Sequence, residues 1–449
     1  MIPTRRRFLM SAALTQLPLR AAERPNIILT MTDDQGWGDV SYNGNPVLKT
    51  PHLDEMSGSG VRFDRFYAAY PVCSPTRASV MTGRHPCRYG CFSWGYDLPL
   101  REVTVAEALK PAGYATGHFG KWHLGGIPYA PGRTNRGRMP GPDDRHPNNQ
   151  GFEEYFSHGN WFDLNPDKLY HNGKAAGRIE GDTSDIVMDR ALEFIRKAKR
   201  PFLAVIWFPS PHGPHQALEK DRAPYLGKPG NADFYGEMAG VDRNIGRLRA
   251  ELRRLGIHRD TMLWFNSDNG AIPAGSTGGL SGAKGNLMEG GIRVPAILEW
   301  PGRITRPFTT KVPCGTVDLY PTILAALGLR AAGQMEPLDG ISLLPLIDGG
   351  MKRRPKPLAF QVRDAKGAVT SAALIDNEFK YYRGPAWAGR IQVKGEGQRE
   401  HLYNLDADAA ETQDLSTQQP EVFVRLRNEW SAWNRSVERD LEAYPFHKS

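Results

Sequence analysis

Short apolar runs alternate with amphipathic segments along the first three quarters of the chain. Three of these runs, 26–32, 202–208 and 262–266, are rich in branched and aromatic residues and apolar on both faces. Such runs are typical of strands buried in a parallel sheet. Apolar positions at helical spacing predict helices over 234–255 and 316–327. The alternation predicts an α/β fold in which helices cover both faces of a mostly parallel sheet.

The pattern changes after about residue 350. Residues 368–374 and 379–382 have the two-residue period of an antiparallel hairpin, and 422–437 predicts a final amphipathic helix. A basic run with a proline marks the change. We therefore expect a main α/β domain over 23–350 and a smaller α+β subdomain, an antiparallel sheet with a terminal helix, over 351–449.

Composition is that of a globular protein. Of 449 residues, 40% are hydrophobic and 24% are charged, which excludes a disordered, collagen-like or coiled-coil chain. No run of about 18 apolar residues occurs, so we expect no membrane span.

The first 22 residues have the layout of a bacterial twin-arginine export signal. Arg5, Arg6 and Arg7 precede a short, mildly apolar stretch that ends in small residues near Ala22. We therefore expect residues 1–22 to be removed and the protein to be periplasmic or secreted. The formal net charge of +8 falls to +4 without this segment. We expect no nucleic-acid partner, and the mild positive charge suits an anionic substrate.

Four cysteines are present, at positions 73, 87, 91 and 314, and none has C-x-x-C spacing, so a thiolate metal site is not expected. Whether Cys87 and Cys91 pair stays open. Cys73 begins the pattern C-x-P-x-R, in which Ser74 and Pro75 suit the first turn of a helix. Arg77 then lies on the same helix face as Cys73, at an end where backbone N–H groups attract anions. A structural cysteine and a nucleophilic thiol are the alternatives.

Polar side chains follow each of the three predicted strands. Asp33 and Asp34 follow the first, His212 the second, and Asp268 and Asn269 the third. Ligands of parallel α/β sheets bind outside the carboxyl ends of the strands, so we expect these side chains to converge. The acidic and amide groups offer only oxygen donors, which favours Ca²⁺, or Mg²⁺, over zinc.

The chain resembles the type I, formylglycine-dependent sulfatases, of the arylsulfatase and N-acetylgalactosamine-6-sulfatase kind, within the alkaline-phosphatase-like superfamily. The motifs that carry the resemblance occur in the family's order: DDQGWGD from Asp33, CSPTR from Cys73, GKWHLG from Gly120, SDNG from Ser267, Lys284, and EGGIRVP from Glu289. The resemblance implies an alkaline-phosphatase-like fold.

The resemblance also implies a chemistry. Cys73 would be oxidised to formylglycine by a dedicated generating enzyme, on the unfolded chain in the cytoplasm, which suits folded export by the twin-arginine route. One hydroxyl of the hydrated aldehyde attacks sulfur, and the second later expels sulfate. A serine ester has no second hydroxyl and cannot be released this way.

Roles follow from the resemblance, position by position. The calcium ligands are Asp33, Asp34, Asp268 and Asn269, together with the modified Cys73. Arg77 stabilises the hydrated aldehyde, and His123 deprotonates it for sulfate release. Lys121, His212 and Lys284 bind the sulfate and the leaving oxygen, and His212 is the general acid. Ser157 and His215 are further candidates for substrate contact.

The expected activity is hydrolysis of a sulfate monoester, with a sulfated sugar or polysaccharide favoured over an aryl sulfate because an exported enzyme meets polymers. A phosphate or phosphonate monoester hydrolase on the same scaffold is the alternative. The natural substrate, the sulfate position and the oligomeric state cannot be derived from the sequence.

Overall fold

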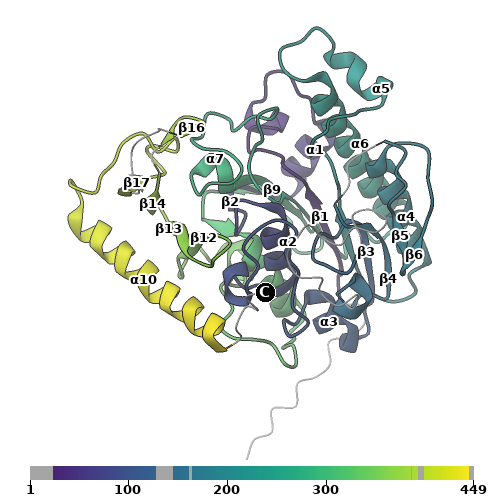
Figure 1. Ribbon diagram of the computed structural model, residues 1–449. Helices are drawn as coiled ribbons and strands as arrows, with labels where there is room; N and C mark the ends of the chain where they lie inside the picture. The colour runs from purple at the N-terminus through teal and green to yellow at the C-terminus, as the bar shows by residue number, and fades with distance from the viewer. Residues whose placement is uncertain (1–23, 128–144, 161–163, 386, 393–398, 444–449) are drawn as a thin grey trace, which may run out of the picture.

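A computed structural model describes residues 24–127, 145–160, 164–385, 387–392 and 399–443 (Figure 1). The export signal that we expect over 1–22 lies outside these residues.

One large sheet runs through the centre of the molecule (Figure 1). Its spatial order is β10-β2-β9-β8-β1-β7-β3-β4-β5-β6, with β11 beside β2. Neighbours from β8 to β4 pair in parallel, whereas β9 is antiparallel to both β8 and β2. The strands are β1 (Asn26–Thr32), β2 (Val61–Tyr67), β3 (Ala115–Lys121), β4 (Glu154–His158), β5 (Tyr170–His171), β6 (Lys174–Ala175), β7 (Phe202–Trp207), β8 (Thr261–Ser267), β9 (Arg293–Glu299), β10 (Phe308–Thr310) and β11 (Cys314–Gly315).

Helices cover both faces of this sheet, because its central strands are apolar on both sides. Ile27 and Leu29 of β1 pack in one core with α2, and Ile28 packs in a second core with α1, α4 and α6. This arrangement confirms the predicted fold class. The helices are α1 (Pro51–Ser59), α2 (Cys73–Thr82), α3 (Val105–Leu109), α4 (Thr183–Lys197), α5 (Glu219–Arg222), α6 (Ala232–Arg254), α7 (Glu289–Ile292), α8 (Leu319–Ala326) and α9 (Leu344–Ile347).

A second, antiparallel sheet follows in the C-terminal region, in the order β12 (Leu358–Arg363), β13 (Val369–Asp376), β14 (Phe379–Gly384), β17 (Arg399–Asn404). The long helix α10 (Pro420–Ala443) packs on one face through Leu426 and Trp430. The other face packs on Tyr67 and Met288 of the main domain. A small hairpin, β15 (Trp387–Ala388) and β16 (Ile391–Gln392), completes the subdomain. The predicted sheet and terminal helix are therefore present, and the boundary at residue 350 stays a prediction.

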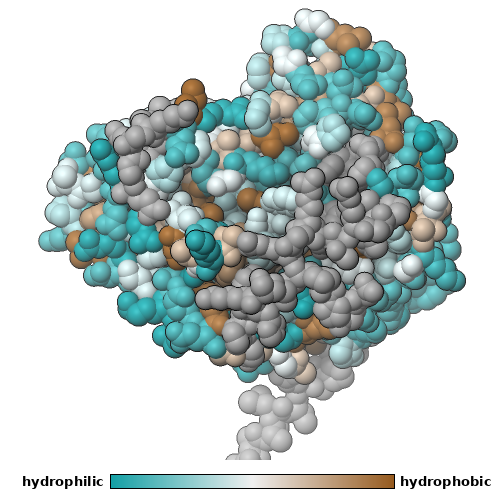
Figure 2. Space-filling model, viewed as in Figure 1, coloured by the Kyte–Doolittle hydropathy of each residue, from teal (hydrophilic) through white to brown (hydrophobic). Residues whose placement is uncertain are grey.

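No helix in the described ranges has the length and apolar character needed to cross a bilayer. On the face that Figure 2 shows, hydrophobic residues form small, separate patches. All four cysteines are buried free thiols, so Cys87 and Cys91 are not joined by a disulfide.

Candidate active site

Acidic and amide side chains meet where β1 and β8 end, because these two strands are neighbours in the sheet. The Asp34 N–H donates to Asp268 Oδ1 at 3.1 Å, and Asn269 Nδ2 donates to Asp34 Oδ1 at 2.8 Å. Asp33, Asp34, Asp268 and Asn269 are all buried. The structure thus brings the expected oxygen donors together at one edge of the sheet.

This group fits a divalent cation. Asp33 Oδ1 and Asn269 Oδ1 are buried and accept no hydrogen bond from any residue that the structure describes, which is unfavourable for a polar atom. Burial, and then the charge of Asp33, raises the pKa of Asp268 to about 7. A hard cation relieves both conditions, since it binds oxygen and offsets negative charge. The residues present therefore suit Ca²⁺ or Mg²⁺, as the sequence predicts.

Cys73 is the first residue of α2 and lies beside these carboxylates. Its Sγ and one oxygen each of Asp33 and Asp268 all lie within 4.8 Å of one another. Val72 is the N-cap of the helix and its side chain makes no capping bond, so the first-turn N–H groups and the helix dipole favour an anion here. Burial raises the pKa of the Cys73 thiol, which disfavours a plain thiolate nucleophile.

Arg77 anchors this helix end to the carboxylates. It is fully buried, and its Nε and Nη2 donate to Asp268 Oδ2 at 3.1 and 2.7 Å. Its Nη1 donates to the Lys121 carbonyl at 3.1 Å, and its guanidinium lies 5.2 Å from the ring centroid of Trp207. A buried guanidinium needs this many partners, since an unpaired buried charge is strongly destabilising. Arg77 therefore fixes Asp268 relative to the start of α2.

Two lysines reach the same carboxylates from different segments. Lys121, the last residue of β3, donates from Nζ to Asp33 Oδ2. Lys284 lies in the loop before α7, with its Nζ 2.5 Å from Asp34 Oδ1. Burial alone would raise the pKa of Asp33. The charges of Lys121 and the other cationic groups around Asp33 nevertheless hold this pKa well below its usual range. The lysines and carboxylates thus form one coupled charge cluster.

Two histidines join the cluster in different environments. His212 Nδ1 lies 2.7 Å from the Gly213 carbonyl oxygen, so Nδ1 carries a proton and donates it there. Its Nε2 lies 3.6 Å from Asp34 Oδ2, and the side chain is 24% exposed. His123 is buried, and burial, with the charges of Lys121 and Arg77, holds its pKa well below the usual value. Its backbone φ is +56°, so the chain is not extended at His123, although the charge of Lys121 still acts on its ring.

Ser157 is not brought to this cluster. Its hydroxyl is buried 2.7 Å from His118 Nδ1 and donates to the His118 carbonyl. Successive residues of a strand point to opposite faces, and the next residue, His158, is the one near the charges. Burial, with Lys121 and Arg77, lowers its pKa to about 3. His158 ends β4 in register with Lys121, so the strand-end rule would have found it.

His215 also lies outside the cluster. Its Nδ1 is 3.3 Å from Glu237 Oε2 of α6, and its ring packs edge-on against Phe234. The Gln216 N–H donates to the other oxygen of Glu237 at 2.6 Å. These bonds tie the segment after His212 to α6. A substrate contact by His215 stays a prediction.

The C-terminal subdomain supports the loop that carries Lys284. Arg390, in the turn between β15 and β16, donates to the carbonyls of Ile272 and Gly275 at 2.5 and 2.9 Å. The Gly282 N–H donates to the Gly389 carbonyl at 2.7 Å. Sequence reasoning missed these residues, because the contacts join segments more than 100 positions apart.

A carboxylate of the first motif supports the same loop. Asp39 accepts hydrogen bonds from the N–H groups of Gly36 and Ser276, at 2.9 and 2.8 Å. A Cβ at Gly36 would lie 2.3 Å from the Ser276 carbonyl oxygen. This close approach is why glycine is needed there.

The chain matches known proteins over most of its length. The family model described as Sulfatase matches residues 25–329. The chain is 32% identical to N-acetylgalactosamine-6-sulfatase of Canis lupus familiaris, over 78% of this chain and 71% of the relative. It is 31% identical to arylsulfatase G of Rattus norvegicus, over 89% and 84% of the two chains.

A solved structure agrees with these matches. The crystal structure of Ps i-CgsB in complex with k-i-k-neocarrahexaose superposes with a TM-score of 0.79 and 26% identity, and covers 94% of this chain and 98% of that one. Fold, charge cluster and family match lead to one assignment: the chain belongs to the sulfatase family and is a sulfuric ester hydrolase.

Proposed function

We propose that this enzyme hydrolyses sulfate monoesters of saccharides, with a formylglycine derived from Cys73 and a calcium ion held by Asp33, Asp34, Asp268 and Asn269. The observation that carries the proposal is the position of Cys73. It begins both the C-x-P-x-R pattern and helix α2, and its Sγ lies within 4.8 Å of two carboxylates of the oxygen set.

The charges around Cys73 suit an anionic ester. The three carboxylates of the set are matched by three cations, Arg77, Lys121 and Lys284. A divalent cation adds two positive charges to this balanced group. The resulting positive field favours a sulfate monoester, which carries one negative charge, and the developing charge of its transition state.

Each side chain then has a role in the reaction. When bound, the cation polarises the ester and the hydrated aldehyde supplies the attacking oxygen. Lys121 and Lys284 bind sulfate oxygens, and Arg77 holds Asp268 in place. His212 protonates the leaving alcohol from Nε2 as the imidazolium, since its Nδ1 already carries the proton that it donates to Gly213. His123 is neutral at physiological pH and accepts a proton during sulfate release.

A saccharide substrate is supported by the relatives. One is named for a sulfated amino sugar, and one structural neighbour was solved with a carrahexaose. The half-exposed side of the site, where His212 and Lys284 lie, is where the alcohol part of a bulky ester would leave.

The proposal is tested with protein co-expressed with a formylglycine-generating enzyme. The kcat/KM values for 4-nitrophenyl sulfate, 4-nitrophenyl phosphate and a phenyl phosphonate monoester are compared, followed by a panel of sulfated saccharides. We expect sulfate esters to exceed the phosphorus esters by at least about 100-fold. A preference for phosphate or phosphonate would establish the alternative activity instead.

We also propose that the enzyme is exported after maturation in the cytoplasm. The arginine-rich start of the chain supports this proposal. Cell fractionation of the wild type and of the Arg5→Lys, Arg6→Lys double variant tests it. The wild type should be found in the periplasm or medium and the double variant in the cytoplasm.

A further inference from the structure

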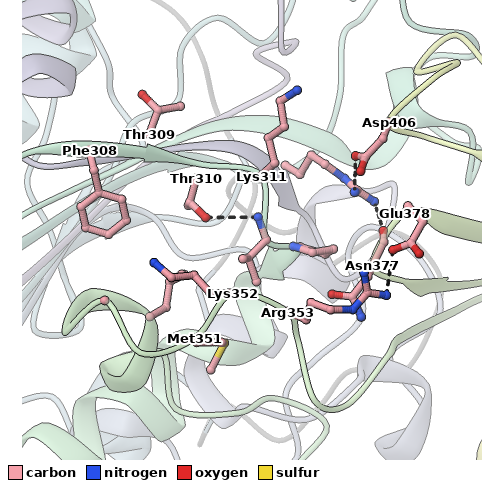
Figure 3. A pocket seen from close by; sticks show the side chains of 15 residues that line it. Phe308, Thr309, Thr310, Lys311, Met351, Lys352, Arg353, Asn377, Glu378 and Asp406 are labelled. Atoms are coloured by element: carbon pink, nitrogen blue, oxygen red, sulfur yellow. Dashed lines mark hydrogen bonds and ion pairs between the residues drawn. The ribbon is translucent and has the colours of Figure 1, made fainter.

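A second pocket, of about 500 Å³, lies where the edge of the main sheet meets the C-terminal sheet. Strand β10 and the loop after it form one wall, and the segment 349–353 forms another. Turns of the second sheet, at Asn377 and Asp406, close the remaining side (Figure 3). None of its lining residues belongs to the charge cluster around Cys73.

Positive charge dominates this pocket. Four cationic side chains, Arg65, Lys311, Lys352 and Arg353, line it, against the two carboxylates of Glu378 and Asp406. Each carboxylate already has a cation: Asp406 lies 3.1 Å from Arg65, and Glu378 lies 2.8 Å from Arg353.

The two lysines of the pocket therefore have no carboxylate partner among its lining residues. Lys311 and Lys352 are exposed and have no carboxylate oxygen within 4.0 Å in the described part of the chain. They come from separate walls, and Figure 3 shows their side chains pointing to different sides of the pocket, so they can meet different charged groups of one ligand.

Arg65 adds a buried donor to this pocket. Its side chain is only 3% exposed, and it donates to the Tyr67 hydroxyl, to Asp406 and to the Asn377 carbonyl. A guanidinium has five N–H groups, so two N–H groups of Arg65 have no acceptor among the residues described. A buried cation with spare donors is a feature of a site that accepts an anion rather than of a solvated surface.

The pocket also has an apolar side. Phe308 and Met351 are half-buried members of its lining. Figure 3 shows Phe308 and Lys352 on one side, and Arg353 with Glu378 and Asp406 on the other. A ring face beside ammonium groups suits a sugar that carries sulfate, because the C–H face of the sugar packs on the aromatic ring while the sulfate meets the cations.

Pocket and active site are on the same sheet. Strand β10 is four strands from β1, so at the usual strand spacing the axes of these two strands are about 19 Å apart. A saccharide of several units is long enough to reach both, whereas a single sulfated sugar is not.

We propose that this pocket is a second binding site for a sulfated saccharide, in which Lys311, Lys352 and Arg65 bind sulfate groups on a chain whose end occupies the active site. The inference rests on the proposed saccharide substrate and deepens it: the enzyme would act on polymers or long oligosaccharides. Two linked contacts raise the effective concentration of the chain at the active site.

Binding is measured with the full-length Cys73→Ala variant, which cannot turn over the ligand. The probes are a sulfated carrageenan hexasaccharide, the same hexasaccharide after desulfation, and inorganic sulfate and phosphate, each by calorimetry. In this background, Lys311→Gln with Lys352→Gln should weaken hexasaccharide binding about tenfold, since each exposed charge contact contributes up to about 1 kcal/mol. The control Lys228→Gln removes an exposed lysine outside the pocket and should leave binding unchanged.

Activity separates this inference from the proposed function. In the active enzyme, the double lysine variant should keep the wild-type kcat/KM on 4-nitrophenyl sulfate. Its kcat/KM on a sulfated polymer should fall about tenfold, mainly because KM rises. Equal hexasaccharide affinity with and without the two lysines would overturn the second site while leaving the sulfatase activity intact. An equal loss of affinity for the sulfated and the desulfated hexasaccharide would overturn the second site too. Binding of inorganic phosphate alone, with no binding of the sulfated hexasaccharide, would also overturn it. If the wild type is inactive on every sulfate ester, the proposed function itself is wrong.

Discussion

Asn269 Nδ2 donates to Asp34 Oδ1 at 2.8 Å, and this bond fixes the orientation of the Asn269 side-chain amide. The two ends of an amide differ in polarity rather than in shape. With the NH₂ group committed to Asp34, the oxygen is the end that is left for a cation. The pair therefore explains why an amide follows Asp268, where a fourth carboxylate would add repulsion.

Removal of the cation should abolish activity and lower stability. Exhaustive chelation should inactivate the wild type, and added Ca²⁺ should restore activity and raise Tm by several degrees, since a ligand at 100 times its Kd adds about 2.7 kcal/mol. Asp268→Asn should lose at least about 100-fold in kcat and show no Tm response to Ca²⁺. The exposed Asp167→Asn is the matched control. Full activity after complete chelation would contradict the cation site.

Cys73 should carry the modification when a formylglycine-generating enzyme is present. Peptide mass spectrometry should show the mass change from thiol to aldehyde at Cys73, and unchanged thiols in the peptide with Cys87 and Cys91. Cys73→Ser should be inactive in a host that cannot oxidise serine, because a serine ester has no second hydroxyl for release of sulfate. An active enzyme with only an unmodified thiol at position 73 would rule the mechanism out.

Replacement of His212 and replacement of His123 should impair different steps of the reaction. His212→Ala should lose about 100- to 10,000-fold on a sulfated sugar, and far less on 4-nitrophenyl sulfate, whose phenolate needs little protonation. His123→Ala should still release alcohol, as a burst followed by slow turnover. Rapid-quench kinetics on both substrates measure the two effects. An equal defect of His212→Ala on both substrates, or a missing burst with His123→Ala, would show that these roles are wrong.

Arg390 should act through Lys284, although it lies in the other subdomain. Loss of its two bonds to the Ile272 and Gly275 carbonyls should cost about 1–3 kcal/mol of loop order, and Arg390→Ala should lower kcat/KM about tenfold or more. Arg390→Lys should recover part of the loss, and the exposed Arg306→Ala should have no effect. In a double-mutant cycle, Arg390→Ala should add little to Lys284→Ala. Fully additive losses would mean that the two residues are independent.

Glu237 should make stability fall as pH rises. It is 4% exposed, and burial raises its pKa to about 7 despite its bonds to His215 and the Gln216 N–H; the charge of Asp182 acts in the same direction. Because its pKa is about 4.5 when unfolded, the folded state binds the extra proton between about pH 4.5 and 7, and stability is lost across that window. Glu237→Gln should therefore unfold like the wild type at pH 4.5 and be more stable at pH 8, by up to about 3 kcal/mol. Denaturant titrations at both pH values test this, and identical pH profiles would contradict it.

The sequence was informative where strands are apolar and uninformative where they are not. β1, β7 and β8 are mostly apolar and buried, so their carboxyl ends, and with them Asp33 and Asp268, could be located from pattern alone. β2 carries Arg62, Asp64 and Arg65, and β3 contains two glycines and a histidine, so neither is an apolar run. These strands form because their neighbours pair with them, and that pairing is a property of the assembled sheet.

Part of the site could not be predicted from the sequence, because it depends on contacts that exist only in the folded protein. Ser157 and His158 are adjacent in a strand of mixed polarity, so the strand-end rule points to His158 only once β4 is known to be a strand paired with β3. Arg390 meets the Lys284 loop only because the C-terminal sheet packs beside α7. Contacts of this kind have no local sequence signal.

Cys73 is 2% exposed, enclosed at the start of α2 against the end of the sheet. An enzyme that must bind and oxidise this residue can reach it only before the domain has folded. Under the proposed function, modification of Cys73 and folding would compete during synthesis, and a molecule that folded first would keep its unmodified thiol. Copies that fold too early would be stable, normal in shape and permanently inert. The specific activity of a preparation would thus report how much modifying enzyme was present while the chains were being made, and no later treatment of the folded protein would change it.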